Sequence, residues 1–346
     1  MIIIYDDIIY SLQRSGGISL YWSQLETYLR KDIRLLYKNC ENNIFFSKSS
    51  IVRGVRNENY VFFERYKNIS LSEKDIFIFH SSYYRYCKNK NTVNITTVHD
   101  FIYEYFRHDI KSIAHKIQKK NTIFHSDGLI FVSENTRNDF HKLFPRYKGA
   151  EKVIYHGIIS DYSYLNIPKK NNVIFIGSRI KYKNFFYAVN LLQKLPQFRL
   201  QIIGGGPLSR IEIANLDRCI PNRYEYCQSL PNKELNIKYN EAFFLLYPSL
   251  YEGFGFPIIE AQAAGCPVIC CNISSLPEIG GDAAVYISGK NIENDLEKIE
   301  QLNDNVFYNN LLKKGFENCK RFSWEKCAKE TYSFYREVYN LKNDNT

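Results

Sequence analysis

Residues 251–265 read Tyr-Glu-Gly-Phe-Gly-Phe-Pro-Ile-Ile-Glu-Ala-Gln-Ala-Ala-Gly, and they carry the strongest fold signal of the chain. Gly253 and Gly255 permit backbone conformations, and a close approach of a ligand, that a side chain would block. Pro257 suits the first turn of a helix, and Gly265 suits the end of that helix. Apolar runs on either side predict buried strands, at residues 242–247 and 267–271. A strand, glycine loop, helix and second strand predict a ligand-binding crossover, in which the helix N-terminus can bind an anion.

Two carboxylates, Glu252 and Glu260, flank the glycine loop. A carboxylate that faced a phosphate at a helix N-terminus would repel it, so we expect both groups to accept hydrogen bonds from hydroxyls. Backbone amides that hold an anion, together with carboxylates that hold hydroxyls, suit a sugar nucleotide. The alternative is that Glu252 is a solvated loop acid and that Glu260 stabilises the positive end of the helix dipole.

The composition indicates a globular chain with an acidic partner. The 346 residues suffice for two domains, and 45% of them are hydrophobic and 24% charged. The formal net charge of +10 suits nucleic acid, a phosphorylated ligand or anionic lipid headgroups as partners. Because the basic residues are dispersed and accompany no nucleic-acid-binding motif, we expect no nucleic-acid partner.

The sequence carries no recognisable signal for membrane insertion or export. No apolar run reaches the roughly 18 residues of a membrane span, and residues 1–7 predict a first strand rather than a signal peptide. The nine cysteines form no CxxC pair, which suits a reducing cytoplasm. The seven histidines do not pair with cysteines or with one another at ligand spacing, so we expect no metal site.

Short apolar runs alternate with helical patterns along the chain, which predicts an α/β fold with parallel sheets. The expected strands of the first half lie at residues 2–5, 75–80, 93–99, 128–133 and 152–155, with a helix at 18–29. The polar segment 166–172 contains a proline and predicts a linker. Beyond it, strands are expected at 173–177, 199–204, 224–227, 243–248, 268–270 and 284–286. We therefore expect domains at 1–165 and 166–330, and a helix at about 330–346 that packs back on the first domain.

A predicted helix near residues 110–124 combines basic and apolar side chains. Its lysines, Lys111, Lys116, Lys119 and Lys120, interleave with Ile110, Ile113, Ile117 and Phe124. This pattern is typical of an amphipathic surface that lies on an anionic membrane. The alternative is an ordinary solvated helix face.

With these pieces in this order, the chain resembles the GT4 family of retaining glycosyltransferases from Asp7 to about Tyr339. Glu252 and Glu260 match the family's E-x7-E motif. Three further stretches resemble the family: Gly204-Gly205-Gly206, residues 274–284 and Phe322-Ser323-Trp324-Glu325. The resemblance implies the GT-B fold, in which two Rossmann-like domains with parallel sheets face each other across a cleft. The first domain would serve the acceptor, and the second would hold the nucleotide sugar.

The resemblance also implies roles for residues of the second domain. Glu260 would hold the ribose hydroxyls of the donor, and Glu252 would contact the transferred sugar. The backbone amides of the loop would meet the sugar and the diphosphate, at Gly253, Phe254, Gly255 and Phe256. Arg179 and Lys183 match the basic pair that neutralises the diphosphate as the glycosidic bond breaks. They lie four residues apart after a predicted strand, so a helical turn would bring them together, and Lys181 competes for the second role.

In the first domain the resemblance points to a glycine loop and a histidine. Gly16 and Gly17 match a loop that lies beside the diphosphate and the acceptor. His99 ends a predicted strand and matches the histidine that faces the transferred sugar. His80 and His156 also follow apolar runs and are weaker candidates.

The implied reaction is transfer of a hexose, with retention at the anomeric carbon, from GDP-mannose or a UDP-hexose to a hydroxyl of a glycan or lipid-linked oligosaccharide. Neither a cofactor nor a metal is required. The expected setting is surface polysaccharide biosynthesis in the cytoplasm, with peripheral association to the inner face of an anionic membrane. Two alternatives stay open: a GT-B sugar-nucleotide epimerase that needs no acceptor, and a non-catalytic nucleotide-sugar-binding protein.

Overall fold

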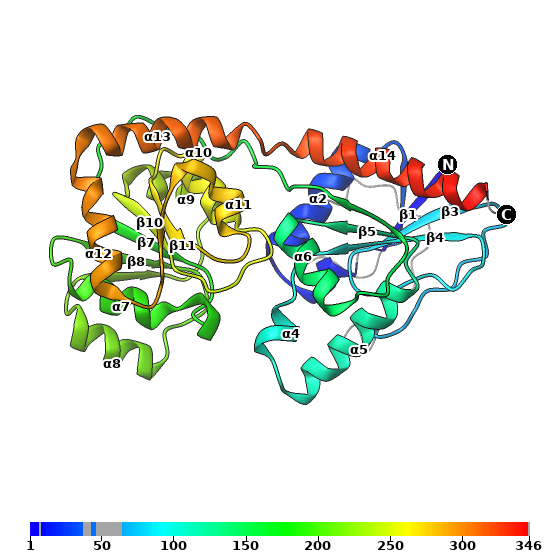
Figure 1. The fold of residues 1–346 in the computed structure, drawn as a ribbon, viewed down its shortest axis with the longest axis horizontal. Coiled ribbons are helices and arrows are strands. Elements are labelled where there is room, and N and C mark those ends of the chain that lie inside the picture. Colours follow the sequence, from blue (N-terminus) through cyan, green and yellow to red (C-terminus); the bar gives the residue numbers. More distant parts are fainter. Residues whose placement is uncertain (7, 37–42, 46–63, 345–346) are drawn as a thin grey trace. The chain divides into compact units, whose positions relative to one another are not determined.

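The computed structural model describes residues 1–6, 8–36, 43–45 and 64–344, so Asp7, where the resemblance begins, lies outside the described residues. The chain forms two compact units (Figure 1). The first unit comprises Met1–Gly157 and Ser323–Thr346, and the second comprises Ile158–Phe322. The chain therefore changes unit at Gly157, upstream of the polar segment 166–172, which lies within the second unit.

The first unit is built on a parallel sheet of six strands in the order β2-β1-β3-β4-β5-β6. The strands are β1 Ile2–Asp6, β2 Ile33–Leu36, β3 Phe77–Ser81, β4 Thr92–Val98, β5 Gly128–Phe131 and β6 Ala150–Val153. Every residue of β3, β4 and β5 is buried, as expected of a parallel sheet covered on both faces. The sequence analysis did not predict β2, a short strand at the sheet edge that includes Arg34.

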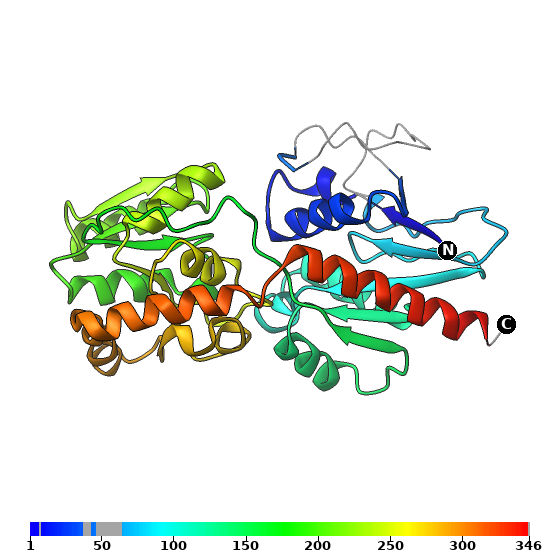
Figure 2. The ribbon, with the colours of Figure 1, turned by 90° about the horizontal axis from the view of Figure 1, so that it is seen from above.

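Six helices accompany this sheet in the described part of the unit: α1 Ile9–Leu12, α2 Gly17–Leu29, α4 Ile102–Phe106, α5 Ile110–Phe124, α6 Glu134–Leu143 and α14 Trp324–Asn343. Ser323 caps α14, because its side chain accepts a hydrogen bond from the N–H of Lys326, so this helix begins before the expected residue 330. This C-terminal helix packs on α2 and on the strands of the first unit (Figure 2). The Tyr335 hydroxyl anchors it, lying 2.9 Å from the Tyr5 hydroxyl and 2.5 Å from Nδ1 of His80.

The second unit contains another parallel sheet of six strands, in the order β12-β11-β10-β7-β8-β9, so both predicted sheets are confirmed. The strands are β7 Asn172–Ile176, β8 Arg199–Ile203, β9 Tyr224–Cys227, β10 Phe244–Tyr247, β11 Val268–Cys271 and β12 Ala284–Ile287. The main helices are α7 Phe185–Gln193, α8 Arg210–Cys219, α9 Asn232–Glu241, α10 Phe256–Ala263, α11 Leu276–Gly280, α12 Ile292–Glu300 and α13 Asn305–Cys319. The strand order reverses between β7 and β10, which makes their carboxyl ends a topological switch point.

The buried core of each unit is apolar, and most cysteines belong to it. All eight cysteines among the described residues are free, and Cys270 and Cys271 are buried in β11. Within the described residues, no helix is both long enough and apolar enough to span a bilayer.

Candidate functional site

The loops that follow β7 and β10 lie against each other at the switch point of the second unit. The backbone N–H of Leu250, after β10, donates to the carbonyl oxygen of Tyr182, after β7, over 2.7 Å. In open parallel sheets, ligands bind outside the carboxyl ends of the strands, at such a reversal of strand order.

A lysine, a glutamate and a tyrosine meet between these two loops. Nζ of Lys183, in the 3-10 turn Lys181–Lys183 after β7, lies 2.5 Å from Oε1 of Glu252. The hydroxyl of Tyr247, at the end of β10, donates to the same oxygen over 2.7 Å and lies 3.1 Å from Nζ. The lysine and glutamate side chains are only 13% and 11% exposed, so their charges face each other with little screening by water.

Burial raises the pKa of Tyr247 well above its ordinary value, and the adjacent Glu252 carboxylate raises it further. Tyr247 therefore remains a neutral hydrogen-bond donor to Glu252. Among the described residues, Oε2 of Glu252 has no hydrogen-bond partner, whereas Oε1 accepts from both Lys183 and Tyr247. The carboxylate thus retains one oxygen that could accept a hydroxyl from a ligand.

Two serines in the segment after β11 form hydrogen bonds with the backbone of the glycine loop. Ser274 Oγ donates to the carbonyl oxygen of Glu252 over 2.6 Å, and Ser275 Oγ donates to the carbonyls of Glu252 and Phe254 over 3.0 and 2.9 Å. These bonds hold the loop in one conformation. Both serines lie in the stretch 274–284 that resembles the family, and no local pattern predicts their contacts with the glycine loop.

The predicted helix after the glycine loop is confirmed as α10. Gly255 is its N-cap with φ of 110°, a conformation that strongly favours glycine, and Pro257 lies in the first turn. The helix ends before Gly265, which has φ of 67°. Gly253 does not have positive φ, so the conformational argument holds for Gly255 and not for Gly253.

Glu260 lies on α10 beside two tyrosines. The Tyr239 hydroxyl donates to Oε2 of Glu260 over 3.2 Å, and Tyr162 packs edge-on against the Tyr239 ring. Burial raises the pKa of Glu260 to about 7, although hydrogen bonds from both tyrosines favour the carboxylate. The carboxyl group is therefore poised between its two protonation states near neutral pH.

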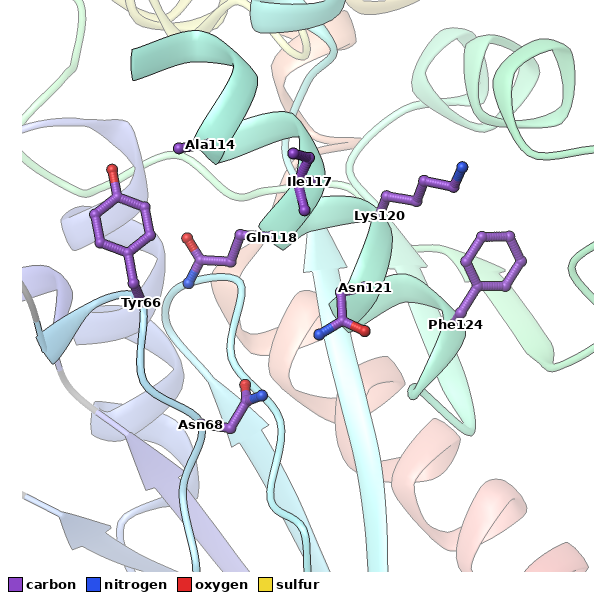
Figure 3. Close-up of a pocket in the computed structure, with 8 residues that line it drawn as sticks. All are labelled: Tyr66, Asn68, Ala114, Ile117, Gln118, Lys120, Asn121 and Phe124. Atoms are coloured by element: carbon purple, nitrogen blue, oxygen red, sulfur yellow. The ribbon is translucent and has the colours of Figure 1, made fainter. Parts of the chain in front are cut away.

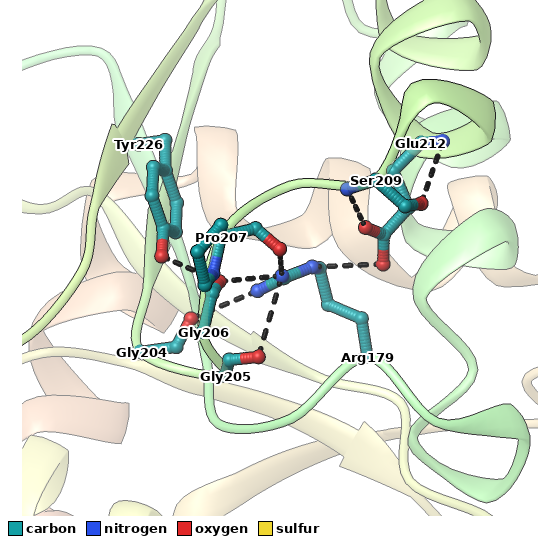
Figure 4. A network of polar contacts seen from close by, with 8 residues as sticks. All are labelled: Arg179, Gly204, Gly205, Gly206, Pro207, Ser209, Glu212 and Tyr226. Carbon is teal, nitrogen blue, oxygen red and sulfur yellow. Dashed lines mark hydrogen bonds and ion pairs between the residues drawn. The ribbon is translucent and has the colours of Figure 1, made fainter.

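Arg179 is held by a different part of the unit, the loop after β8 (Figure 4). Its guanidinium donates to the carbonyl oxygens of Gly204 and Gly206 over 2.8 and 2.7 Å, and to that of Pro207 over 2.9 Å. Nε lies 2.8 Å from Oε1 of Glu212 on α8, and the arginine side chain is 4% exposed. Arg179 thus ties this loop to the first turn of α8.

The predicted helical turn from Arg179 to Lys183 does not form. Ile180 is extended, with ψ of 160°, and the 3-10 turn begins only at Lys181. Because the chain is extended between them, Arg179 reaches the loop after β8 while Lys183 reaches Glu252. Lys181, the competitor for the second role, is exposed.

Glu212 is a residue that the sequence analysis missed. It forms a reciprocal capping box with Ser209 at the start of α8 and also binds Arg179. The Ser-x-x-Glu spacing was the available signal for the cap. The bond between Glu212 and Arg179 depends on the pairing of β7 with β8, so no local sequence pattern predicts it.

In the first unit, His99 follows β4 and contacts two aromatic rings. Its ring centroid lies 5.3 Å from that of Tyr21 on α2 and 5.8 Å from that of His156. Burial lowers the pKa of His99 to about 3, and the positive charge of Lys119 acts in the same direction. His99 is therefore a neutral imidazole throughout the physiological range.

The remaining candidates of this unit lie at the start of α2 or in the core of the sheet. Gly16 is the N-cap of α2 and Gly17 its first residue, at the carboxyl end of β1. The sheet order reverses between β1 and β3, so these glycines lie at the switch point of the first unit. His80 is fully buried between Tyr335 and Thr97, and burial lowers its pKa well below the ordinary value. His80 is thus a core residue of the sheet.

No group of three or more histidine, cysteine or acidic side chains with metal-binding geometry occurs among the described residues.

Comparison with known proteins shows consistent similarities. Residues 162–317 match the family of group 1 glycosyl transferases. An uncharacterized glycosyltransferase of Methanocaldococcus jannaschii is 29% identical over 93% of this chain and 95% of its own length. The O-antigen chain mannosyltransferase B of Escherichia coli is 36% identical over 112 residues, which are 32% of this chain and 29% of that relative.

Among solved structures, the sucrose-phosphate synthase of Thermosynechococcus elongatus has a TM-score of 0.74 at 18% identity, and covers 99% of this chain and 100% of its own. At this level of identity the likeness concerns the fold. The two six-stranded parallel sheets, each with helices, are those of the GT-B glycosyltransferases.

Proposed function

We propose that this chain, whose residues 162–317 match the group 1 glycosyl transferases, transfers a hexose from a nucleotide-diphosphate sugar to a hydroxyl of a glycan acceptor, with retention at the anomeric carbon. The observation that carries the proposal is the cluster of Lys183, Glu252 and Tyr247 at the switch point of the second unit. It combines a cation for a phosphate with a carboxylate for sugar hydroxyls, on two loops that a ligand at this crevice would contact.

In this proposal the second unit binds the donor. Lys183 and the backbone amides of residues 253–256 hold the diphosphate and sugar, and the free oxygen of Glu252 accepts a hydroxyl of the transferred hexose. Glu260 accepts the ribose hydroxyls, because one carboxylate can receive two vicinal hydroxyls at once. Arg179 contributes its positive charge from behind the Gly204–Gly206 loop while it holds that loop in place.

The catalytic effect is electrostatic. When the bond between the anomeric carbon and the diphosphate oxygen breaks, negative charge grows on the leaving group, and a preorganised lysine stabilises that charge most in the transition state. The acceptor oxygen forms the new bond to the same face of the anomeric carbon, and its proton passes to the departing phosphate. The reaction therefore forms one bond to the anomeric carbon, breaks one bond and transfers one proton, and it needs no enzyme nucleophile. In the first unit, the neutral side chain of His99 forms hydrogen bonds with substrate hydroxyls. The backbone amides of Gly16 and Gly17 bind anionic groups.

Mannose is the hexose that we propose first, carried as GDP-mannose, with a UDP-hexose as the other donor. The support is the 36% identity, over 112 residues, to the E. coli O-antigen chain mannosyltransferase B. The acceptor would then be a growing surface polysaccharide or a lipid-linked oligosaccharide at the membrane.

The test is a thermal-shift panel of the purified protein with GDP, UDP, dTDP and ADP sugars, with magnesium and with chelator. A ligand that binds only the folded state must raise the melting temperature. We expect one nucleotide family to raise it, and Glu260→Ala to abolish the shift. Mass spectrometry of a reaction with that donor and a mannoside acceptor then detects the elongated glycan. The absence of a shift with every donor would count against the proposal, and release of nucleotide with an altered sugar and no acceptor would identify an epimerase instead.

A further inference from the structure

Asn184, the residue after Lys183, is held by a contact that an ordinary helix start does not need. It is the N-cap of α7, but its side chain makes no capping hydrogen bond among the described residues. Instead, its Nδ2 donates to the carbonyl oxygen of Gly289 over 2.9 Å, a residue 105 positions further along the chain. Its backbone is left-handed, with φ of 59°, a conformation that asparagine tolerates better than most residues. Both the side chain and the backbone of Asn184 therefore set the path of the chain directly after Lys183.

The acceptor of this bond belongs to a turn that a buried carboxylate fixes. Asp295 of α12 is fully buried and accepts hydrogen bonds from the backbone N–H groups of Ser288 and Gly289, over 2.7 and 2.9 Å. The Ser288 hydroxyl donates to the same carboxylate over 2.8 Å, and the hydroxyl of Tyr187 on α7 donates to it over 2.5 Å. Such bonds are what a carboxylate needs when it is removed from water. Asp295 thus ties the turn after β12 to the helix that begins at Asn184.

Gly289 allows this turn to come close to Asn184. Its φ is 66°, and a Cβ at this position would lie 2.4 Å from the sulfur of Cys271 and 3.3 Å from Nδ2 of Asn184. A side chain would therefore push the turn away. In the sheet, β11 and β10 separate β12 from β7, so the turn after β12 extends past two strand ends to meet the residue after Lys183.

The backbone on both sides of Lys183 is consequently fixed by other loops. Before the lysine, the carbonyl oxygen of Tyr182 accepts a hydrogen bond from the N–H of Leu250, after β10, over 2.7 Å. After the lysine, Asn184 is bonded to the turn after β12. A lysine side chain has many rotamers, and a fixed backbone reduces the freedom that its ammonium loses when it meets an anion.

We propose that Asn184 is a positioning residue for the diphosphate of the donor and acts through Lys183. This inference rests on the proposed function and deepens it, because it assigns part of the diphosphate affinity to a contact behind the lysine. The amide of Asn184 is bonded to Gly289 and itself touches no phosphate. Without that bond, Lys183 points at the ligand in only a fraction of the molecules, and the apparent affinity falls by that fraction.

The experiment is isothermal titration calorimetry of the full chain with GDP and UDP, and with GMP and UMP. In the proposed reaction, the charge that Lys183 stabilises develops on the phosphate bonded to the sugar, which the monophosphates lack. The test variant is Asn184→Gly, which keeps the left-handed backbone and removes the amide. The matched control is Asn222→Gly, since Asn222 is another left-handed asparagine of the second unit, with φ of 58°, and is exposed before β9.

We expect Asn184→Gly to raise the Kd of the nucleoside diphosphate about tenfold, the size of one lost hydrogen bond. The Kd of the monophosphate should stay within about twofold of the wild-type value. Asn222→Gly should bind all the nucleotides as the wild type does. Asn184→Ala also loses the ease of the left-handed backbone, so its diphosphate affinity should be lower than that of Asn184→Gly.

A hollow in the first unit is the alternative site for these nucleotides. It measures about 630 Å³ and lies between α5 and the segment before β3, where Tyr66 and Asn68 face Gln118 and Lys120 (Figure 3). Its volume is within the range of ligand pockets, and Lys120 supplies a cation. Lys120→Ala should bind the nucleoside diphosphate as the wild type does. Loss of that binding would place the nucleotide in the hollow and overturn the inference.

Two further results would overturn the inference alone. The first is an equal diphosphate Kd for Asn184→Gly and the wild type, even if Asn184→Ala binds more weakly, because backbone strain would then be the cause. The second is an equal loss of affinity for diphosphate and monophosphate, which would indicate general loosening of the unit. If the wild type binds neither GDP nor UDP, the proposed function fails and the inference fails with it, so the two failures are distinguishable. Melting temperatures of the variants verify that each is folded.

Discussion

Nζ of Lys183 lies 2.5 Å from Oε1 of Glu252, although 69 residues separate the two along the chain. The parallel pairing of β7 with β10 brings their loops together, and Tyr247 adds a third group to the contact. The pair is nearly buried, and both contacts are made through Oε1 of Glu252. Each charge therefore fixes the position of the other, while Oε2 stays available for a ligand.

Loss of the lysine should impair both stability and turnover. Lys183→Ala leaves Glu252 nearly buried without its counter-charge. We therefore expect the free energy of unfolding, measured with urea, to fall by about 3 kcal/mol. We also expect kcat to fall at least 100-fold, since the cation acts on charge that develops in the transition state. Lys183→Arg, which keeps the charge, should recover most of the stability. Near wild-type turnover by Lys183→Ala would refute the proposed role.

Donor affinity should depend on pH through Glu260. Ribose hydroxyls donate to the carboxylate and favour it over the acid, so binding should strengthen as pH rises through the free-protein pKa of about 7. Between pH 6 and 8 the Kd of the nucleotide should fall about tenfold. In Glu260→Gln the Kd should be higher and should not change with pH. Isothermal titration calorimetry at the two pH values provides the measurement. A flat profile in the wild type would show that Glu260 does not receive the ribose.

The same carboxyl group predicts a stability trend. Its pKa is higher in the folded protein than the ordinary 4.5, so the folded state holds the proton more tightly than the unfolded chain does. The stability that this group contributes is complete below pH 4.5 and is lost as pH rises to about 7. Denaturant midpoints of the wild type should therefore decline over this range relative to those of Glu260→Gln. Parallel midpoints would contradict the prediction.

Arg179 and Lys181 should differ sharply, although both are basic and only two positions apart. Arg179→Ala removes the donors from several loop carbonyls and from Glu212, so we expect the free energy of unfolding to fall by about 2–4 kcal/mol. Lys181→Ala removes an exposed charge and should cost less than about 0.5 kcal/mol. Urea unfolding of both variants decides the matter, and equal effects would mean that the Arg179 contacts do not stabilise the loop.

His99 should not titrate near neutral pH. Its pKa of about 3 means that the folded protein keeps it neutral, while the unfolded chain takes up a proton near pH 6.5. The contribution of His99 to the free energy of unfolding should therefore decrease as the pH falls below 6.5 and should be constant above that pH. NMR of the histidine rings, with His99→Gln to assign the signal, should show no titration of His99 between pH 5 and 8. A midpoint near 6.5 would contradict the neutral hydrogen-bonding role.

The sequence predicted the elements whose signals are local. Gly255 and Pro257 start α10 and Gly265 follows its end, as expected, and Ser323 caps α14. These succeed because a positive φ, a missing N–H or a capping hydroxyl acts within a single turn. Strand β2 escaped prediction because a short edge strand has weak apolar alternation.

The sequence was less informative about which side chains meet. The spacing of Arg179 and Lys183 suggested one cluster, but an extended residue at Ile180 sends them to different loops. The roles of Tyr247, Ser274 and Ser275 follow from the pairing of strands that are distant in sequence. For α5 the pattern indicated an amphipathic helix, and the burial of Lys119 and His115 showed which face is turned outward.

By itself, then, the sequence determined the alternation of strands and helices, the glycine loop with its helix, and the identity of the charged candidates, since periodicity and caps are written in neighbouring residues. The folded chain was needed to show that Lys183 pairs with Glu252, that Arg179 binds the loop after β8, and that α5 exposes its isoleucines. The physical reason is that these contacts depend on the order of strands in a sheet and on which groups lose their water, and neither is encoded at a fixed spacing along the chain.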